Sequence, residues 1–358
     1  MSLWVDKYRP RSIEALTYHS ALSDELKALA ASGDFPHILV YGPSGAGKKT
    51  RVMAVLKELY GNGAEKIKIA SRVFQIGTSS RKVEFNVVSS NYHIEFTPSD
   101  MGNNDRVVIQ DLLKEIAQTQ SVDTRSKNRF KTVVINEADS LSRDAQAALR
   151  RTMEKYSANI RLVLLANSTS NIISPIKSRT LLIRVPAPSA EEIGEVILQI
   201  AKKEKVLLPS TEEEQKELFD KLTRLSHRNL RKCILMFEAM YSASNGNALT
   251  VATPTPSPDW EQVIGKIADE ILRTRTVANL LSIRGTLYDL IAHCIPPETI
   301  LRTLTYELLH KANYNVGPSI VEAAAFYFHR LRQGSKAIFH LEACIAKYMQ
   351  IIETFHTK

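Results

Sequence analysis

Cysteine is scarce in this sequence, and the three cysteines present, Cys233, Cys294 and Cys344, are widely separated. None of them forms the closely spaced pair that a structural zinc site requires. The nine histidines are also scattered rather than grouped as metal ligands. We therefore expect reduced, mostly buried thiols in an intracellular protein, and histidines with structural or surface roles.

Long apolar runs are also missing. None approaches the roughly 20 residues that span a bilayer, so no membrane partner is expected. The first residues, MSLWVDK, lack the hydrophobic core of a signal peptide. The composition, 44% hydrophobic and 24% charged, is that of a folded globular protein. A chain of 358 residues allows about two to three domains.

Acidic residues are outnumbered by basic ones, which gives a net charge of +9 and a pI near 9.3. Such a balance favours acidic partners such as nucleic acid, although it says nothing about geometry.

Residues 37–50, HILVYGPSGAGKKT, have the features of a phosphate-binding loop. A short apolar run resembles a buried strand, a glycine-rich turn follows it, and residues 51–60 carry apolar side chains at helical spacing. In this context backbone N–H groups converge on phosphate oxygens at a helix N-terminus, and a lysine reaches the terminal phosphates. The expected nucleotide-binding residues of the loop are Gly42, Pro43, Ser44, Gly45, Ala46, Gly47, Lys48, Lys49 and Thr50.

The magnesium site of this loop departs from the usual pattern. A Ser or Thr hydroxyl normally follows the loop lysine and holds the metal, but Lys49 stands there. Thr50 comes one residue later, about 100° around a helix, so it cannot simply replace that hydroxyl. The positive charge of Lys49 should weaken magnesium binding by repulsion.

A second nucleotide motif, residues 131–139, shows a matching departure. It is expected to be a buried strand ending in acidic residues, of which the first supports magnesium and the second polarises water in related ATPases. Here the first is Asn136, while Glu137 and Asp139 keep their charge. We interpret the site as one that holds nucleotide but hydrolyses it slowly or not at all. The alternative is that Lys48 and Glu137 suffice and that phosphates and water hold most of the magnesium.

The rest of the chain divides by composition. We expect a nucleotide-binding domain over 1–186, a small helical lid over 187–243, a proline-rich linker over 244–258 and a helical domain over 259–358. Ser189 and Glu192 form a capping-box pattern at the start of the lid. The N-terminal segment WVDKYRP should be extended near Pro10 rather than helical. It either covers apolar surface or lines a purine pocket. The expected strands are 83–96, 131–139, 161–166 and 181–185, and the expected helices are 107–116, 142–156, 191–205, 212–225, 229–241, 260–273, 277–293, 298–311, 320–332 and 336–355.

Single polar residues at element ends are weaker candidates. Asn167 follows a buried strand, where it can orient water or a terminal phosphate. Arg231 opens a lid helix and could bend back towards nucleotide. Arg106 begins a helix and could meet a DNA backbone, and Arg179 could enter a neighbouring subunit's site. For both of these arginines an ordinary surface role is the simpler interpretation.

Taken in order, WVDKYRP, GPSGAGKKT, NEAD, ALRRTMEKY, the Ser-Arg pair at 178 and 179, the lid and the last helical domain resemble one family along nearly the full chain. The sequence is similar to the small subunits of eukaryotic replication factor C, the AAA+ sliding-clamp loader, and most to the type with a GKKT loop and a degenerate acidic motif. The resemblance implies an α/β AAA+ P-loop domain, with a parallel sheet between helices, a helical lid and an all-α collar for oligomerisation.

The resemblance also implies residue roles. Arg179 takes the arginine-finger position, although Thr180 follows it where the family has cysteine. Arg106 matches an arginine that touches the DNA backbone. Glu137 stays in the degenerate acidic motif, and no residue is assigned to metal with certainty. The residues that match the family's adenine pocket and its two nucleotide sensors are Val5, Tyr8, Arg9, Thr17, Asn167 and Arg231.

The function implied is that of one subunit of a nuclear heteropentamer that uses ATP to load the clamp PCNA on primer-template DNA in replication and repair. The partners would be a large subunit and three other small subunits, with other large subunits in alternative and checkpoint loaders. ATP or ADP would occupy the site, with magnesium weakened. Two alternatives stay open: an independently active AAA+ ATPase, and a scaffold with a vestigial site.

Overall fold

The computed structural model describes residues 2–32, 35–75, 82–98, 105–118, 130–244, 246–334 and 336–356. They form two compact units, Met1–Thr255 and Pro256–Lys358, which are described separately below. Within the described ranges no helix is both long enough and apolar enough to cross a membrane.

The first unit is built on a sheet of seven strands in the order β2-β3-β4-β5-β6-β1-β7 among the described residues. Strands β4, β5, β6, β1 and β7 are parallel, whereas β2 and β3 add an antiparallel hairpin at one edge. The strands are β1 Ile38–Tyr41, β2 Lys68–Gln75, β3 Lys82–Ser89, β4 His93–Phe96, β5 Lys131–Ile135, β6 Ile160–Ala166 and β7 Leu181–Arg184.

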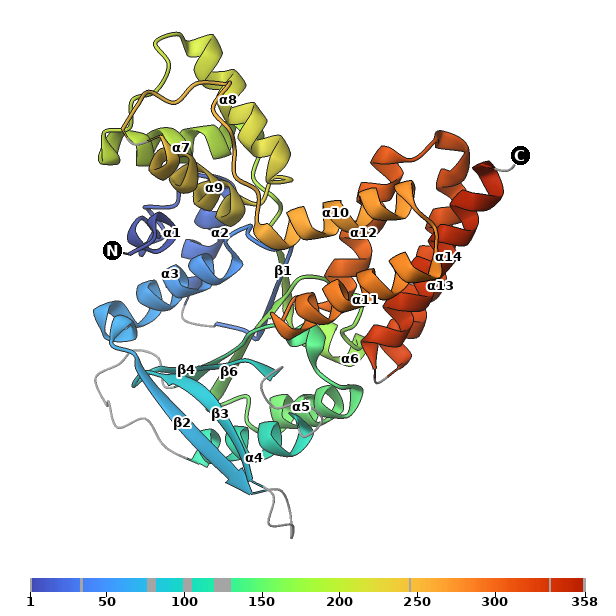
Figure 1. Cartoon of the computed structure of the whole chain (residues 1–358). Helices are drawn as coiled ribbons and strands as arrows, with labels where there is room; N and C mark the ends of the chain where they lie inside the picture. Colours follow the sequence, from blue (N-terminus) through green and yellow to red (C-terminus); the bar gives the residue numbers. More distant parts are fainter. Residues whose placement is uncertain are drawn as a thin grey trace. The chain divides into compact units, whose positions relative to one another are not determined.

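Helices cover both faces of this sheet, as Figure 1 shows. The helices before the lid are α1 Trp4–Lys7, α2 Ser20–Ala31, α3 Lys48–Tyr60, α4 Asp105–Gln118, α5 Arg143–Lys155 and α6 Ser174–Lys177, with short 3-10 turns η1 Gly61–Glu65 and η3 Ala138–Ser140. Side chains alternate between the faces along each strand, which is the period of a pleated sheet. On β5, Val133 and Ile135 pack with α4 and α5, while Val134 packs with α2 and α3. An apolar run without polar interruption is what a strand covered on both faces requires.

The predicted fold class, an α/β P-loop domain with a helical lid and a C-terminal helical domain, is therefore correct. Several local features, the short helix α6 among them, differ from the expectations or were not anticipated. The N-terminal segment begins with one helical turn, α1, and leaves the helix at Tyr8 before Pro10. Helix α2 and strand β2 were not predicted. The polar stretch expected to be a loop, 123–131, lies almost wholly outside the described residues.

The lid consists of α7 Ala190–Glu204, α8 Glu212–Leu225 and α9 Leu230–Ala243. Its start confirms the predicted capping box: the Ser189 hydroxyl accepts from the Glu192 N–H at 3.1 Å, and the Glu192 carboxylate accepts from the Ser189 N–H at 2.7 Å. Trp4 belongs to the same hydrophobic core as the lid helices, with its ring 5.7 Å from that of Phe237. The N-terminal turn is therefore part of the lid.

The segment expected to be a linker, 244–258, is packed on the lid over most of its length. Leu249 is fully buried in the lid core, and its N–H donates to the Leu207 carbonyl at 2.9 Å. The ammonium group of Lys221 donates to the carbonyls of Val251 and Thr253. Proline and small residues suggested a flexible connection, but the single buried leucine anchors it. The division between the two units falls at its end, between Thr255 and Pro256.

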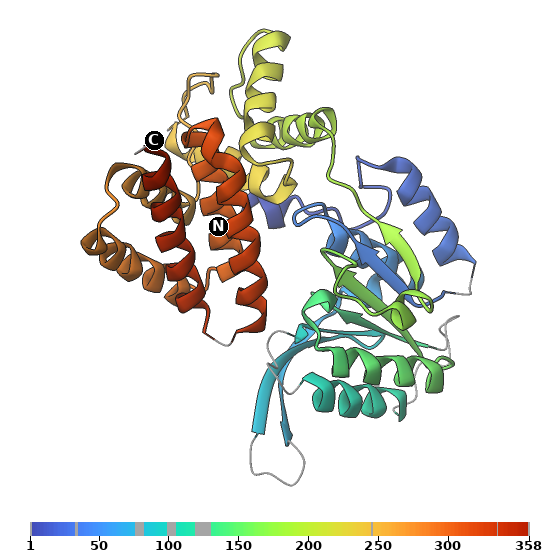
Figure 2. The ribbon, with the colours of Figure 1, turned by 90° about the vertical axis from the view of Figure 1, so that its right-hand side faces the viewer.

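The second unit is entirely helical over its described residues, as predicted. Its elements are α10 Asp259–Arg273, α11 Val277–Ala292, α12 Pro297–Lys311, η4 Tyr314–Val316, α13 Gly317–Gln333 and α14 Ala337–His356. Figure 2 shows α13 and α14 side by side in orange-red and red. The buried Tyr348 hydroxyl lies 2.9 Å from that of Thr305, which satisfies both polar groups inside an otherwise aliphatic core.

Replacing Leu249 tests the packing of this connecting segment. We expect Leu249→Ala to lower the free energy of unfolding by about 2–5 kcal/mol, because it empties a fully buried site. The matched control is Leu207→Ala, whose side chain is 60% exposed and whose backbone pairs with that of Leu249, and its effect should stay within about 0.5 kcal/mol. Equal effects in urea denaturation would contradict a packed segment.

Candidate nucleotide site

The phosphate loop connects β1 to α3, as predicted. Two of its glycines, both with positive φ, lie so close to other parts of the chain that a Cβ atom would clash there. At Gly47, with φ 85°, a Cβ would lie 2.1 Å from the Tyr18 hydroxyl oxygen. At Gly45, with φ 75°, a Cβ would lie 1.7 Å from Oδ1 of Asn229. The loop is thus closely covered by the N-terminal segment on one side and by the lid on the other, and only glycine fits there.

A cavity of about 320 Å³ lies beside the loop, within the size range of small-ligand sites. It brings together α1, α3, the lid helices α7 and α9, and the chain between Tyr8 and Tyr18. Eight of the residues expected to bind nucleotide line it: Val5, Tyr8, Arg9, Thr17, Gly45, Gly47, Thr50 and Arg231. The N-terminal arm therefore both packs on the lid and lines the cavity, so the two interpretations of it are compatible.

Lys48 folds back on its own loop. Its ammonium group donates to the carbonyls of Gly42 at 2.7 Å and Pro43 at 2.9 Å, and to Oδ1 of Asn167 at 2.9 Å. Burial lowers the pKa of Lys48, and the nearby positive charge of Arg231 acts in the same direction, while Asp139 opposes both. Asp139 also accepts from the Asn167 N–H at 3.1 Å. The lysine and the strand-end amide that were predicted to bind phosphate are thus in direct contact with each other.

The two positions that normally supply magnesium ligands in a P-loop site carry Lys49 and Asn136, and both side chains contact Glu95. The Lys49 ammonium group donates to Oε1 of Glu95, a carboxylate on β4 whose side chain is 5% exposed. The amide of Asn136 donates to the same oxygen at 2.8 Å. Over the described part of the chain, no cluster of three or more His, Cys, Asp or Glu side chains could hold a metal ion. Lys49 thus stands at the sequence position of the usual hydroxyl ligand, and its ammonium group is paired with Glu95.

Arg51 and Tyr18 form a chain of contacts that ends at the phosphate loop. The guanidinium group of Arg51, 1% exposed, donates to the Tyr18 carbonyl at 2.6 Å and to the Ser23 hydroxyl at 2.8 Å. It also lies 4.8 Å from the Tyr18 ring, in a cation–π contact. The Tyr18 hydroxyl in turn donates to the Ala46 carbonyl at 3.2 Å. Burial lowers the pKa of Arg51 and raises that of Tyr18.

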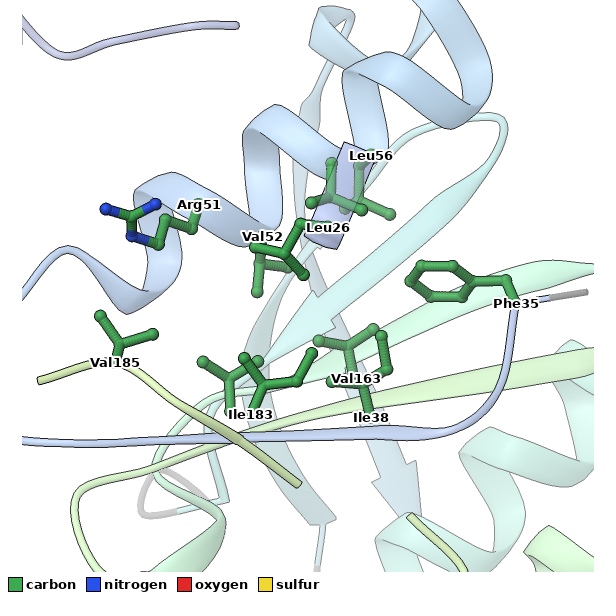
Figure 3. A pocket seen from close by; sticks show the side chains of 11 residues that line it. Leu26, Phe35, Ile38, Arg51, Val52, Leu56, Val163, Ile183 and Val185 are labelled. Atoms are coloured by element: carbon green, nitrogen blue, oxygen red, sulfur yellow. The ribbon is translucent and has the colours of Figure 1, made fainter. Parts of the chain in front are cut away.

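A second, much smaller gap lies under α3 and is not a ligand site. Its volume of about 10 Å³ holds at most one water molecule, and its walls are almost all aliphatic or aromatic. Figure 3 shows the nitrogen atoms of Arg51 pointing away from those aliphatic side chains. The gap is a packing defect of the core between α2, α3 and the sheet.

Three other residues that were predicted to be functional, Glu137, Arg179 and Arg106, are not among the residues that line the cavity. Glu137 is exposed at the end of β5, with a positive φ of 48°. Arg179 follows α6, where its Nη2 is 2.6 Å from Oε1 of Glu154 and its Nη1 donates to the Pro175 carbonyl. Arg106 is exposed in the first turn of α4. Neither arginine is among the residues that line the cavity.

Four residues of the site were missed by the sequence analysis: Tyr18, Arg51, Glu95 and Asn229. Glu95 is an acid between apolar neighbours in a predicted strand, which was a usable signal for a buried partner. Tyr18, Arg51 and Asn229 carried no comparable signal, because each acts through a contact with chain that is distant in sequence.

Comparisons with known proteins give matches that cover nearly the whole chain. Three family models match: "DNA polymerase III, delta subunit" over residues 18–189, "RCF1/5-like, AAA+ ATPase lid domain" over 195–242, and "Replication factor C subunit 3, C-terminal domain" over 260–356. The chain is 58% identical to Replication factor C subunit 5 of Neurospora crassa, covering 99% of this chain and 98% of that protein. It is 49% identical to human Replication factor C subunit 3, covering 99% and 97%.

Among solved structures, a mutant of RuvB from Thermotoga maritima aligns with a TM-score of 0.50 over 78% of this chain and 85% of that one. Its sequence is 13% identical, so the likeness concerns the fold alone. The fold and the phosphate loop define an AAA+ nucleotide-binding protein. The full-length relatives place it more narrowly: the chain belongs to the small subunits of replication factor C, the clamp-loader family that the sequence resembles.

The contact between Gly45 and the lid gives a testable consequence for nucleotide binding. We expect Gly45→Ala to weaken ADP binding at least about tenfold. Its Cβ would displace the Asn229 side chain, which accepts from the Lys232 N–H and caps the helix that carries Arg231. Isothermal titration with ADP measures the change.

Gly61→Ala is the matched control. Gly61 also has a positive φ, 68°, but nothing lies within 4 Å of the point that a Cβ would occupy there. Both variants should lose about 1–2 kcal/mol of stability from the strained backbone. Comparable loss of ADP affinity in the two variants would show that the lid contact is unimportant.

Proposed function

We propose that this chain binds ATP or ADP in the cavity beside its phosphate loop, as one small subunit of a nuclear, heteropentameric clamp loader that acts in DNA replication and repair. The observation that carries the proposal is the cavity itself. It joins the phosphate loop to the N-terminal arm and the lid, and Arg231 lines it. The loop also carries Lys48, which contacts Asn167, and cations and an amide are groups that a triphosphate needs. The charge of +9 fits an acidic polymer as a partner.

The proposed partners are those that the family resemblance implies. They would be a large subunit and three other small subunits, the clamp PCNA and primer-template DNA. Large subunits of alternative and checkpoint clamp loaders would assemble with the same chain. The all-helical second unit, with strongly exposed apolar side chains such as Val277 and Tyr314, is suited to oligomerisation.

Arg179 would act in a neighbouring subunit's site rather than in its own. Its side chain is one-third exposed, and its ion pair with Glu154 lies at the surface, where such pairs are worth little. A phosphate oxygen could therefore replace Glu154 without a large cost. An arginine that enters a phosphoryl-transfer site in this way stabilises the charge that develops there.

Arg106 would contact DNA through phosphates. The carboxylate of Asp105 accepts from the N–H and the hydroxyl of Ser142, and so joins the N-terminus of α4 to that of α5. Arg106 projects from this junction of two helix N-termini, where phosphate groups are favoured. Contacts of this kind carry no sequence preference and weaken with salt.

The arginine-finger role predicts a large effect of one surface side chain. In the reconstituted complex, we expect Arg179→Ala to lower DNA- and clamp-stimulated ATP turnover by roughly tenfold or more, while ADP binding by this chain is unchanged. Lys177→Ala, which removes a cation two residues away at the end of α6, is the control and should have little effect.

A steady-state ATPase assay on the three complexes gives the answer. Full activity of the Arg179→Ala complex would favour a scaffold role. Loss of activity with Lys48→Ala in this chain, but not with Arg179→Ala, would favour an independently active ATPase.

A further inference from the structure

The carboxylate of Glu95 is buried in a place where a lone charge would be costly. It lies on β4, where its backbone is in register with Val134 of β5, and the residue is 4% exposed. A carboxylate removed from water needs an opposite charge and hydrogen-bond donors. Lys49 provides the charge and Asn136 an additional donor, both directed at the same oxygen atom.

The two partners of Glu95 stand where a P-loop protein normally places its magnesium ligands. Lys49 directly follows the loop lysine, where a hydroxyl otherwise holds the metal, and Asn136 ends the strand where a carboxylate otherwise supports it. At the first position the ammonium group of Lys49 replaces a hydroxyl, and at the second the amide of Asn136 replaces a carboxylate. Both side chains donate N–H groups to Glu95. Because Glu95 brings both side chains to one point, the replacements act as a unit.

We infer that the Lys49 ammonium group takes the place of the divalent cation, so that this site binds nucleoside di- or triphosphate without magnesium. The inference rests on the proposed nucleotide binding and specifies how the phosphates are neutralised. An ammonium group has three N–H donors, and the bond to Glu95 uses one of them. The Lys49 side chain is 46% exposed, so the remaining donors are accessible from solvent and open to a phosphate oxygen.

Glu95 has a second effect on the site without nucleotide. Lys48, Lys49 and Arg231 bring three cations to one short loop, and the charge of Arg231 already helps to lower the pKa of Lys48. Like charges repel one another, so the three cations oppose each other in the site without nucleotide. By neutralising Lys49, Glu95 limits this repulsion and aims the ammonium group along one direction. Glu95 is thus a positioning residue, whereas Lys49 touches the ligand.

The test is the affinity of the full chain for ADP, measured by fluorescence with a labelled ADP in excess magnesium and in excess EDTA. We expect the wild-type dissociation constants in the two conditions to agree within about threefold. The double variant Lys49→Thr/Glu95→Gln restores the usual hydroxyl and removes the carboxylate that would otherwise stay buried without its cation. It should bind about tenfold or more weakly in EDTA and recover at least part of that loss in magnesium.

Lys57→Thr is the matched control, because Lys57 lies on the same helix and forms an ion pair with Glu65 at 2.8 Å. It should behave as the wild type in both conditions. A wild-type affinity that falls about tenfold or more in EDTA would overturn the inference, as would a double variant that binds as tightly as the wild type in EDTA. Wild-type protein that binds no ADP in either condition would instead overturn the proposed function, and the inference with it.

Discussion

The nucleotide cavity depends on one constraint: the N-terminal segment belongs to the core of the lid and also touches the phosphate loop. Trp4 and Tyr18 pack with the lid helices, and the Tyr18 hydroxyl donates to the carbonyl of Ala46 in the loop. Arg51 holds Tyr18 from α3, the helix that the loop opens. The loop and the lid therefore line one cavity, and a nucleotide bound there as proposed would contact both.

In the proposed function, the charges around the loop favour binding of a nucleotide over its hydrolysis. Lys48, Asn167 and Arg231 keep the features that bind phosphates, whereas Lys49 and Asn136 replace the groups that would hold magnesium. A metal ion bridges and neutralises the phosphate oxygens during phosphoryl transfer. A side-chain ammonium group neutralises the charge of one phosphate oxygen, but it does not bridge two phosphate oxygens in the fixed geometry that a metal ion imposes. In the proposed function the nucleotide of this site stabilises the subunit, and Arg179 acts in the site of a neighbouring subunit.

The sequence was sufficient for the fold class and for most elements because their signals are local, whereas α1, α2, α6 and β2 were missed. Buried strands, the glycine-rich turn and the Ser189 capping box each depend on a few neighbouring residues, and their positions were predicted within a few residues. The site was only partly predictable. Its family motifs could be read directly, but Glu95, Tyr18 and Asn229 matter through contacts across the fold. Leu249 shows the same limit, since one buried side chain makes a proline-rich segment part of the lid.

The claim that this subunit holds nucleotide without hydrolysing it is tested most directly in an assembled complex where it alone can bind ATP. Replacing the phosphate-loop lysine by alanine in every other subunit provides that complex. With DNA, clamp and magnesium present, the account predicts bound ATP that is recovered intact after single-turnover incubation. Conversion of the bound ATP to ADP, abolished by Lys48→Ala in this chain, would contradict it.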